Sequence, residues 1–155
     1  MFEFLPGALS NLGFQGTYTL VDSGGFTNST LGSPQTSITQ FLPLAGLSEH
    51  TFNATLFYET EKLSARLAYN WRSDFLITAR DDIFPYSPIF QESGGQLDGS
   101  IFYSITDDIK LGVQGVNLLD SVTRTTQAID YDLTRVQRSA FRNDRRFSFL
   151  VRFDF

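Results

Sequence analysis

The sequence predicts an all-β fold, an antiparallel up-and-down meander of about six strands, and three observations predict it. Apolar and polar side chains alternate at every second position in six segments, and no segment keeps a helical period of 3.6 residues. The connections between these segments alternate between short and long. The last segment, RRFSFLVRFDF, keeps its alternation up to a terminal phenylalanine.

Each segment predicts a strand because its apolar side chains share one face. Residues 12–23 carry Leu12, Phe14, Tyr18 and Leu20. Residues 50–60 carry Phe52, Ala54, Leu56 and Tyr58, and residues 63–75 carry Leu63, Ala65, Leu67, Tyr69, Trp71 and Phe75. Residues 96–106 carry Leu97, Ile101, Tyr103 and Ile105, and residues 109–118 carry Ile109, Leu111 and Val113. Residues 145–155 carry Phe147, Phe149, Val151, Phe153 and Phe155, and none of these rows contains a charged residue.

The lengths of the connections predict where the strands lie. Residues 60–62 and 106–108 form tight hairpins, whereas residues 24–49, 76–95 and 119–144 are long loops. Loops longer than about 12 to 15 residues are uncommon in compact soluble domains. Outer-membrane barrels have short periplasmic turns and long extracellular loops. The pattern therefore predicts an open segment of a transmembrane β-barrel in the bacterial outer membrane, with its C-terminus at the periplasmic rim.

The charges of the terminal strand predict which face meets lipid. If the apolar row of this strand faced the lumen, Arg146 and Arg152 would face lipid. Each arginine would then destabilise the inserted strand by about 2 to 4 kcal/mol near the midplane. The apolar rows are therefore expected outside and a polar row inside the lumen: Arg66, Asn70, Arg72, Asp74, Asp98, Lys110, Gln114, Arg146 and Arg152. We interpret this row as a charge network across neighbouring strands in preference to a contact with a plug or a solute.

Composition excludes several classes of function. The chain of 155 residues has no cysteine and one histidine, so a thiolate metal site and a cysteine nucleophile are impossible. No apolar stretch approaches the roughly 20 residues of a membrane helix. The net charge of -5 argues against nucleic acid as a partner, despite the arginines between residues 135 and 146.

No motif predicts catalysis or a cofactor. No serine lies in a G-x-S-x-G motif, and Gly94-Gly95 precedes a strand where a phosphate loop would precede a helix. The pairs at residues 81–82 and 107–108 lack the spaced ligands of an EF-hand, and His50 has no ligand partner nearby in the sequence. We therefore expect no enzyme, no cofactor and no metal.

The long loops offer the candidate substrate contacts, because functional loops often extend from a rigid scaffold. Their aromatic residues include Phe26 and Phe41. The candidates for contact with a substrate are Phe84, Tyr86, Phe90 and Tyr131.

Six ordered strings resemble the C-terminal barrel region of TonB-dependent outer-membrane receptors. They are residues 4–7 with the strand around Thr17-Tyr18-Thr19, residues 47–59, residues 63–75, Gln96-Leu97-Asp98, residues 116–120 (VNLLD) and residues 146–155. The resemblance covers nearly the whole chain.

The resemblance implies energised uptake of a scarce nutrient such as a siderophore, cobalamin or an oligosaccharide, through a plugged barrel of about 22 strands. Six strands are fewer than the roughly eight of the smallest single-chain barrels, and residues 1–155 show no plug domain, TonB-contacting segment or signal peptide. The whole chain, residues 1–155, is therefore expected to be a C-terminal fragment of a receptor barrel. Its expected partners are outer-membrane lipid, the rest of the receptor chain, TonB through the missing N-terminal part, and the barrel-assembly machinery that recognises the terminal strand.

Two alternatives remain open at this point. The first is a complete small outer-membrane barrel with a role in adhesion or anchoring, which needs at least about eight strands. The second is a soluble β-sandwich or ligand-binding barrel, in which the apolar rows face a core.

Overall fold

The computed structural model describes residues 6–31, 38–83, 86–130 and 132–153. In these ranges the chain forms twelve strands and one short 3₁₀ helix, Gly7–Asn11, so the predicted all-β class is confirmed. No helix within the described ranges is long and apolar enough to cross a bilayer.

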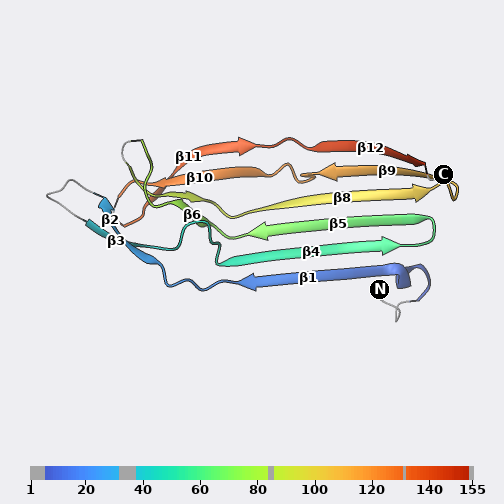
Figure 1. The fold of residues 1–155 in the computed structure, drawn as a ribbon, viewed down its shortest axis with the longest axis horizontal. Helices are drawn as coiled ribbons and strands as arrows, with labels where there is room; N and C mark the ends of the chain where they lie inside the picture. The colour runs from blue at the N-terminus through green and yellow to red at the C-terminus, as the bar shows by residue number, and fades with distance from the viewer. Residues whose placement is uncertain (1–5, 32–37, 84–85, 131, 154–155) are drawn as a thin grey trace.

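Six long strands form one open antiparallel sheet, which we call the wall (Figure 1). In spatial order they are β1 (Leu12–Leu20), β4 (His50–Glu59), β5 (Leu63–Arg72), β8 (Gly94–Ser104), β9 (Ile109–Val116) and β12 (Arg146–Phe153). These are the six predicted strands, although β1 and β5 each end three residues earlier than expected. The predicted meander is therefore present, with β1 and β12 as its two edges.

The long connections contain six further strands, so the expectation of loops at residues 24–49, 76–95 and 119–144 was wrong. A hairpin is formed by β2 (Phe26–Leu31) and β3 (Ile38–Leu42). A four-stranded sheet, which we call the outer sheet, has the order β11 (Arg135–Arg142), β10 (Val122–Ala128), β7 (Ile89–Gln91) and β6 (Phe75–Thr78). The strand β7 has only three residues, and Ile89 and Phe90 are both buried, so its sequence shows no alternation.

The two predicted hairpins close one end of the wall. Between β4 and β5, the Leu63 amide donates to Thr60 Oγ1 over 2.9 Å. Between β8 and β9, the Ile105 amide donates to the Ile109 carbonyl over 2.9 Å, and the Ile109 amide donates to Thr106 Oγ1 over 3.1 Å. The outer sheet and the β2–β3 hairpin lie at the other end (Figure 1). Short and long connections therefore alternate between the two ends, as the sequence predicts.

The register of the wall aligns its apolar side chains on one face, because directly paired residues in an antiparallel sheet point to the same side. One continuous row crosses all six strands: Leu12, Tyr58, Ala65, Ile101, Val113 and Phe149. The next row is Phe14, Leu56, Leu67, Gly99, Gly115 and Phe147. We call this the apolar face, and its side chains are largely exposed, with Ile101 at 56% and Phe149 at 82%.

The hydrophobic core lies among the long connections. In the described ranges it is formed by Leu42, Leu76 and Phe90, which are at most 1% exposed, and the side chains of Phe26 and Leu133 pack against it. Most of these residues come from the β2–β3 hairpin and the outer sheet, and Leu133 lies in the connection between β10 and β11. The wall itself contributes no side chain to this cluster.

Two aromatic rings on the polar side of the wall cover glycines on the neighbouring strand. Phe57 lies directly opposite Gly13, and Phe102 lies directly opposite Gly112. A Cβ atom at either glycine would lie 2.3 Å from the nearest ring carbon. Each ring therefore rests on bare backbone, an arrangement that compensates for the missing side chain of a strand glycine. This packing explains why Phe57 and Phe102 break the polar alternation of their strands.

Replacing Gly112 with alanine should destabilise the wall by about 1 to 3 kcal/mol, because the new methyl group meets the Phe102 ring. The measurement is urea unfolding in detergent micelles. Gly94→Ala is the matched control, since a Cβ atom at Gly94 of β8 meets nothing within 4 Å. The cost of Gly112→Ala should shrink in a Phe102→Ala background, and equal costs in both backgrounds would contradict the packing explanation.

Candidate functional site

The face of the wall opposite the apolar face, which we call the polar face, carries most of the predicted lumen row. Arg66, Asn70 and Arg72 lie on β5, Asp98 on β8, Lys110 and Gln114 on β9, and Arg146 and Arg152 on β12. Their register does not pair opposite charges: Asp98 lies opposite Ala68, and Lys110 lies opposite Arg152. The ion pairs between described residues lie outside these strands, apart from a 3.6 Å contact between His50 and Glu49.

Asp74 was wrongly placed in this row. It follows the end of β5, and its Oδ2 accepts a hydrogen bond of 2.7 Å from Nη1 of Arg135 on β11. The strand stops at Arg72, so the alternation that the sequence suggests does not continue to Asp74. This carboxylate therefore links the end of the wall to the outer sheet.

Four segments connect the long strands of the wall to the strands of the outer sheet, and we call them the junction. They are residues 73–74, 92–93, 117–121 and 143–145. Hydrogen bonds link two of these segments to neighbouring strands: the Glu92 amide donates to the Arg124 carbonyl of β10 over 3.0 Å, and Ser121 Oγ donates to the Gly95 carbonyl of β8 over 2.5 Å. Because the chain leaves the wall at each of these segments, the junction fixes how the outer sheet joins it.

Asn117 makes the densest set of contacts in the junction. It is 4% exposed and has a left-handed backbone, φ +57°, which asparagine tolerates better than most residues. Its amide donates to Asp98 Oδ1 over 2.9 Å, and its Oδ1 accepts from the Ser121 amide over 2.9 Å. Its Nδ2 donates to the carbonyl of Asn143. The backbone of Asn117 thus contacts β8, and its side chain ties the residue before β10 to the connection between β11 and β12.

Asp120 neutralises two arginines at the same place. It also has a positive φ, +55°, and its carboxylate pairs with the guanidinium of Arg142. Arg145 Nη2 lies 3.7 Å from Asp120 Oδ2. The hydrogen bond from Arg142 holds the pKa of Asp120 below its usual value. The arginine cluster of the sequence is therefore partly balanced within the protein.

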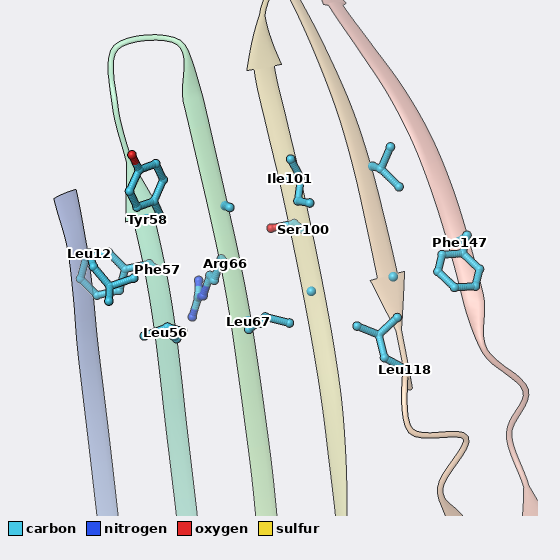
Figure 2. A pocket seen from close by; sticks show the side chains of 14 residues that line it. Leu12, Leu56, Phe57, Tyr58, Arg66, Leu67, Ser100, Ile101, Leu118 and Phe147 are labelled. Atoms are coloured by element: carbon cyan, nitrogen blue, oxygen red, sulfur yellow. The ribbon is translucent and has the colours of Figure 1, made fainter. Parts of the chain in front are cut away.

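Leu118 points to the apolar face. Its amide donates to the Leu97 carbonyl over 2.8 Å, and its side chain lies over the directly paired glycines Gly99 and Gly115. A Cβ atom at Gly115 would lie 2.6 Å from Leu118 Cδ2. Leu118 borders a shallow hollow of about 300 Å³ on this face, together with Leu56, Leu67 and Phe147 (Figure 2). Two glycines in adjacent strands create this depression.

A second hollow, of about 270 Å³, lies where the polar face meets the junction. Its lining is rich in amides and hydroxyls, among them Thr51, Asn53, Asn70, Gln96, Asn117 and Asn143. Its two charged residues are Arg72 and Glu92. Of these lining residues, sequence reasoning had singled out only Asn70 and Arg72 as site residues. The hollow was missed because the pairing of Asn53 with Asn70 and of Asn70 with Gln96 depends on the register between strands, which the sequence does not give.

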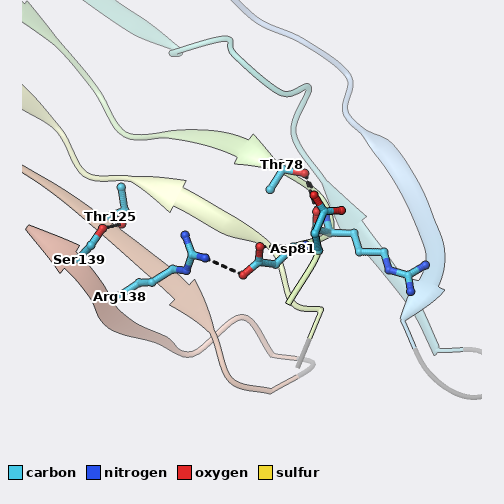
Figure 3. A network of polar contacts seen from close by, with 7 residues as sticks. Thr78, Asp81, Thr125, Arg138 and Ser139 are labelled. Carbon is cyan, nitrogen blue, oxygen red and sulfur yellow. Dashed lines mark hydrogen bonds and ion pairs between the residues drawn. The ribbon is translucent and has the colours of Figure 1, made fainter. Parts of the chain in front are cut away.

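The outer sheet is held by polar contacts (Figure 3). Arg138 Nη2 donates to Asp81 Oδ2 over 2.8 Å, and the hydroxyls of Thr125 and Ser139 lie 2.5 Å apart. The Asp81 carboxylate, one half of the acidic pair in the sequence, is thus occupied by an arginine. Within the described residues no three His, Asp or Glu side chains are grouped to hold a metal ion.

The four aromatic residues that the sequence offered as substrate contacts lie in different surroundings or outside the described residues. Phe90 is 1% exposed beneath the guanidinium of Arg135, which lies 3.6 Å from the ring centroid, so it is a core residue and the expectation of a ligand contact was wrong. Tyr86 is 42% exposed, with Arg80 5.0 Å above its ring. Phe84, Tyr131 and Phe155 lie outside the described residues.

Replacing Asn117 with alanine should destabilise the protein by about 2 to 3 kcal/mol, because it removes two buried side-chain hydrogen bonds and leaves a Cβ atom in a left-handed backbone. Asn117→Gly separates the two effects, since glycine adopts this backbone without strain. We expect urea unfolding to order the proteins as wild type, Asn117→Gly, then Asn117→Ala. An unchanged midpoint in both variants would contradict the role of Asn117 in the junction.

No protein-family model, curated protein or solved structure matches this chain. Its function is therefore inferred from the two faces of the wall and from the junction.

Proposed function

We propose that this chain is part of the barrel wall of a TonB-dependent receptor in the bacterial outer membrane, which takes up a scarce nutrient and performs no catalysis. The observation that carries the proposal is the apolar face. Its side chains stay in register across six strands and remain exposed: Phe14, Leu56, Leu67, Ile101, Val113 and Phe149 are each at least 40% exposed. Exposed apolar surfaces of this continuity are typical of membrane or partner contacts.

The terminal strand argues against the soluble alternative. A β-sandwich or a ligand-binding barrel would bury its apolar row in a core. Phe147, Val151 and Phe153 are each at least 56% exposed, and Phe149 is more exposed still. The cluster of buried apolar residues lies among the long connections instead. Lipid is the proposed surrounding of this row.

The dimensions and the edges of the wall also support a barrel. Its strands have 8 to 11 residues, close to the roughly 9 to 11 tilted residues that cross a bilayer. An open edge cannot persist in lipid, because unpaired backbone groups there cost several kcal/mol each. In the proposed assembly, β1 and β12 therefore pair with further strands of the receptor barrel. That requirement favours the receptor over a small barrel made of this wall alone.

The receptor family is proposed from the resemblance of the sequence strings, two of which meet at the junction. Two of the strings that carry the resemblance, Gln96-Leu97-Asp98 and residues 116–120, bind each other through Asp98 and Asn117. In the proposed receptor the barrel-assembly machinery recognises β12, and TonB acts through a part of the receptor other than this wall.

An arginine placed on one face of β8 or the other should show which face meets lipid and which faces the lumen. Ile101→Arg places a charge on the apolar face and should cost about 2 to 4 kcal/mol near the midplane. Ser100→Arg, its neighbour on the polar face, is the matched control and should fold like wild type. Folding of the natural gene product that contains residues 1–155 into phosphatidylcholine vesicles is followed by the change in gel mobility between unheated and heated samples. Equal folding of both variants would contradict the proposed facing.

Transport is tested in cells. A strain that lacks the gene should lose uptake of one labelled iron chelate, cobalamin or oligosaccharide, and a strain that lacks TonB should lose the same uptake. Restoring the gene should restore uptake only where TonB is present. Uptake that continues without TonB would contradict a TonB-dependent receptor while leaving the membrane wall intact.

A further inference from the structure

The polar hollow at the junction offers hydrogen bonds but little net charge. Of its two charged residues, Arg72 is already engaged: Nε donates to Ser48 Oγ over 2.8 Å, Nη2 donates to the Gly46 carbonyl over 3.3 Å, and the guanidinium lies 3.8 Å from the Phe75 ring centroid. Glu92 balances the remaining formal charge. An anionic chelate would find no free cation here, and a metal ion would find no cluster of carboxylates among the described residues.

The polar side chains of the hollow form a ladder. Asn53, Asn70 and Gln96 lie directly opposite one another on β4, β5 and β8. Directly paired positions place their Cβ atoms about 4.5 to 5.5 Å apart. Nε2 of Gln96 is engaged by Asp98 over 2.9 Å. Among the described residues, no protein group hydrogen-bonds to the side-chain amides of Asn53 and Asn70, so both are available to a ligand.

We propose that this hollow binds one ring of a neutral oligosaccharide. An amide side chain donates and accepts hydrogen bonds at once, and so does each hydroxyl group of a sugar. Adjacent hydroxyls on one ring can therefore meet the adjacent amides of Asn53 and Asn70 without any charged partner. The volume of about 270 Å³ lies below the range of pockets that enclose a drug-sized ligand, and it suits one ring of a longer chain.

The inference rests on the proposed function, because the polar face then lines the lumen. The inference narrows the proposed nutrient from siderophore, cobalamin or oligosaccharide to oligosaccharide. A siderophore complex would require cationic or aromatic groups that this hollow does not present in a free state. If the polar face met lipid instead of the lumen, the amides of Asn53 and Asn70 could bind no sugar.

The test uses the natural gene product that contains residues 1–155, inserted in detergent or vesicles and verified as folded. An array of neutral oligosaccharides identifies the tightest ligand, which is then titrated. The titration is followed by isothermal titration calorimetry, which needs no label on the protein or the sugar. The double change Asn53→Ala with Asn70→Ala should weaken binding about tenfold or more, because it removes neutral hydrogen bonds at two positions.

Gln114→Ala is the matched control. Gln114 lies on the same polar face, opposite Ser100 and outside this hollow, so its loss should leave affinity unchanged within about twofold. Two results would overturn the proposal: a folded protein that binds no neutral oligosaccharide on the array, or affinity that the double variant leaves unchanged. Because folding into the membrane is verified first, either result refutes the ligand without refuting the barrel wall.

Discussion

The register of backbone hydrogen bonds in the wall is the constraint on which the other features depend. Strand side chains alternate with a period of two, so a slip by one residue would move a whole row to the other face. The observed register instead keeps Leu12, Tyr58, Ala65, Ile101, Val113 and Phe149 together. The same register places Asn53, Asn70 and Gln96 opposite one another on the other side. One set of pairings therefore creates both a lipid-compatible surface and a polar one.

Glycines let the wall accept side chains that its alternation does not explain. Phe57 and Phe102 lie on the polar face, where their rings cover Gly13 and Gly112. On the opposite face, Leu118 rests on Gly99 and Gly115. In each case an apolar group covers exposed backbone, which shields strand hydrogen bonds from solvent. These four glycines of the wall are thus sites of close packing.

The sequence predicted the wall well because each of its strands is long and has one apolar face. Residues 50–60 and 63–72 keep an apolar residue at every second position, and β4 and β5 lie there. The outer sheet was missed because β6 and β7 have only 4 and 3 residues, and because β10 and β11 carry no apolar row at every second position. Asp74 and Phe90 were misplaced for the same reason, since a strand ended or began where the alternation gave no sign. The polar hollow was beyond prediction, because it requires the register between three strands and the turn at Asn117.

The turn at residues 117–121 shows how one short string serves both faces of the wall. The left-handed backbone of Asn117 directs its side chain to the polar junction, where it binds Ser121 and Asn143. The next residue, Leu118, lies over the paired glycines of the apolar face. Asp120 then returns to left-handed geometry and binds Arg142. A shift of this turn would therefore disturb the apolar surface, the polar hollow and the attachment of the outer sheet together, which couples the shape of the proposed binding hollow to the position of the outer sheet.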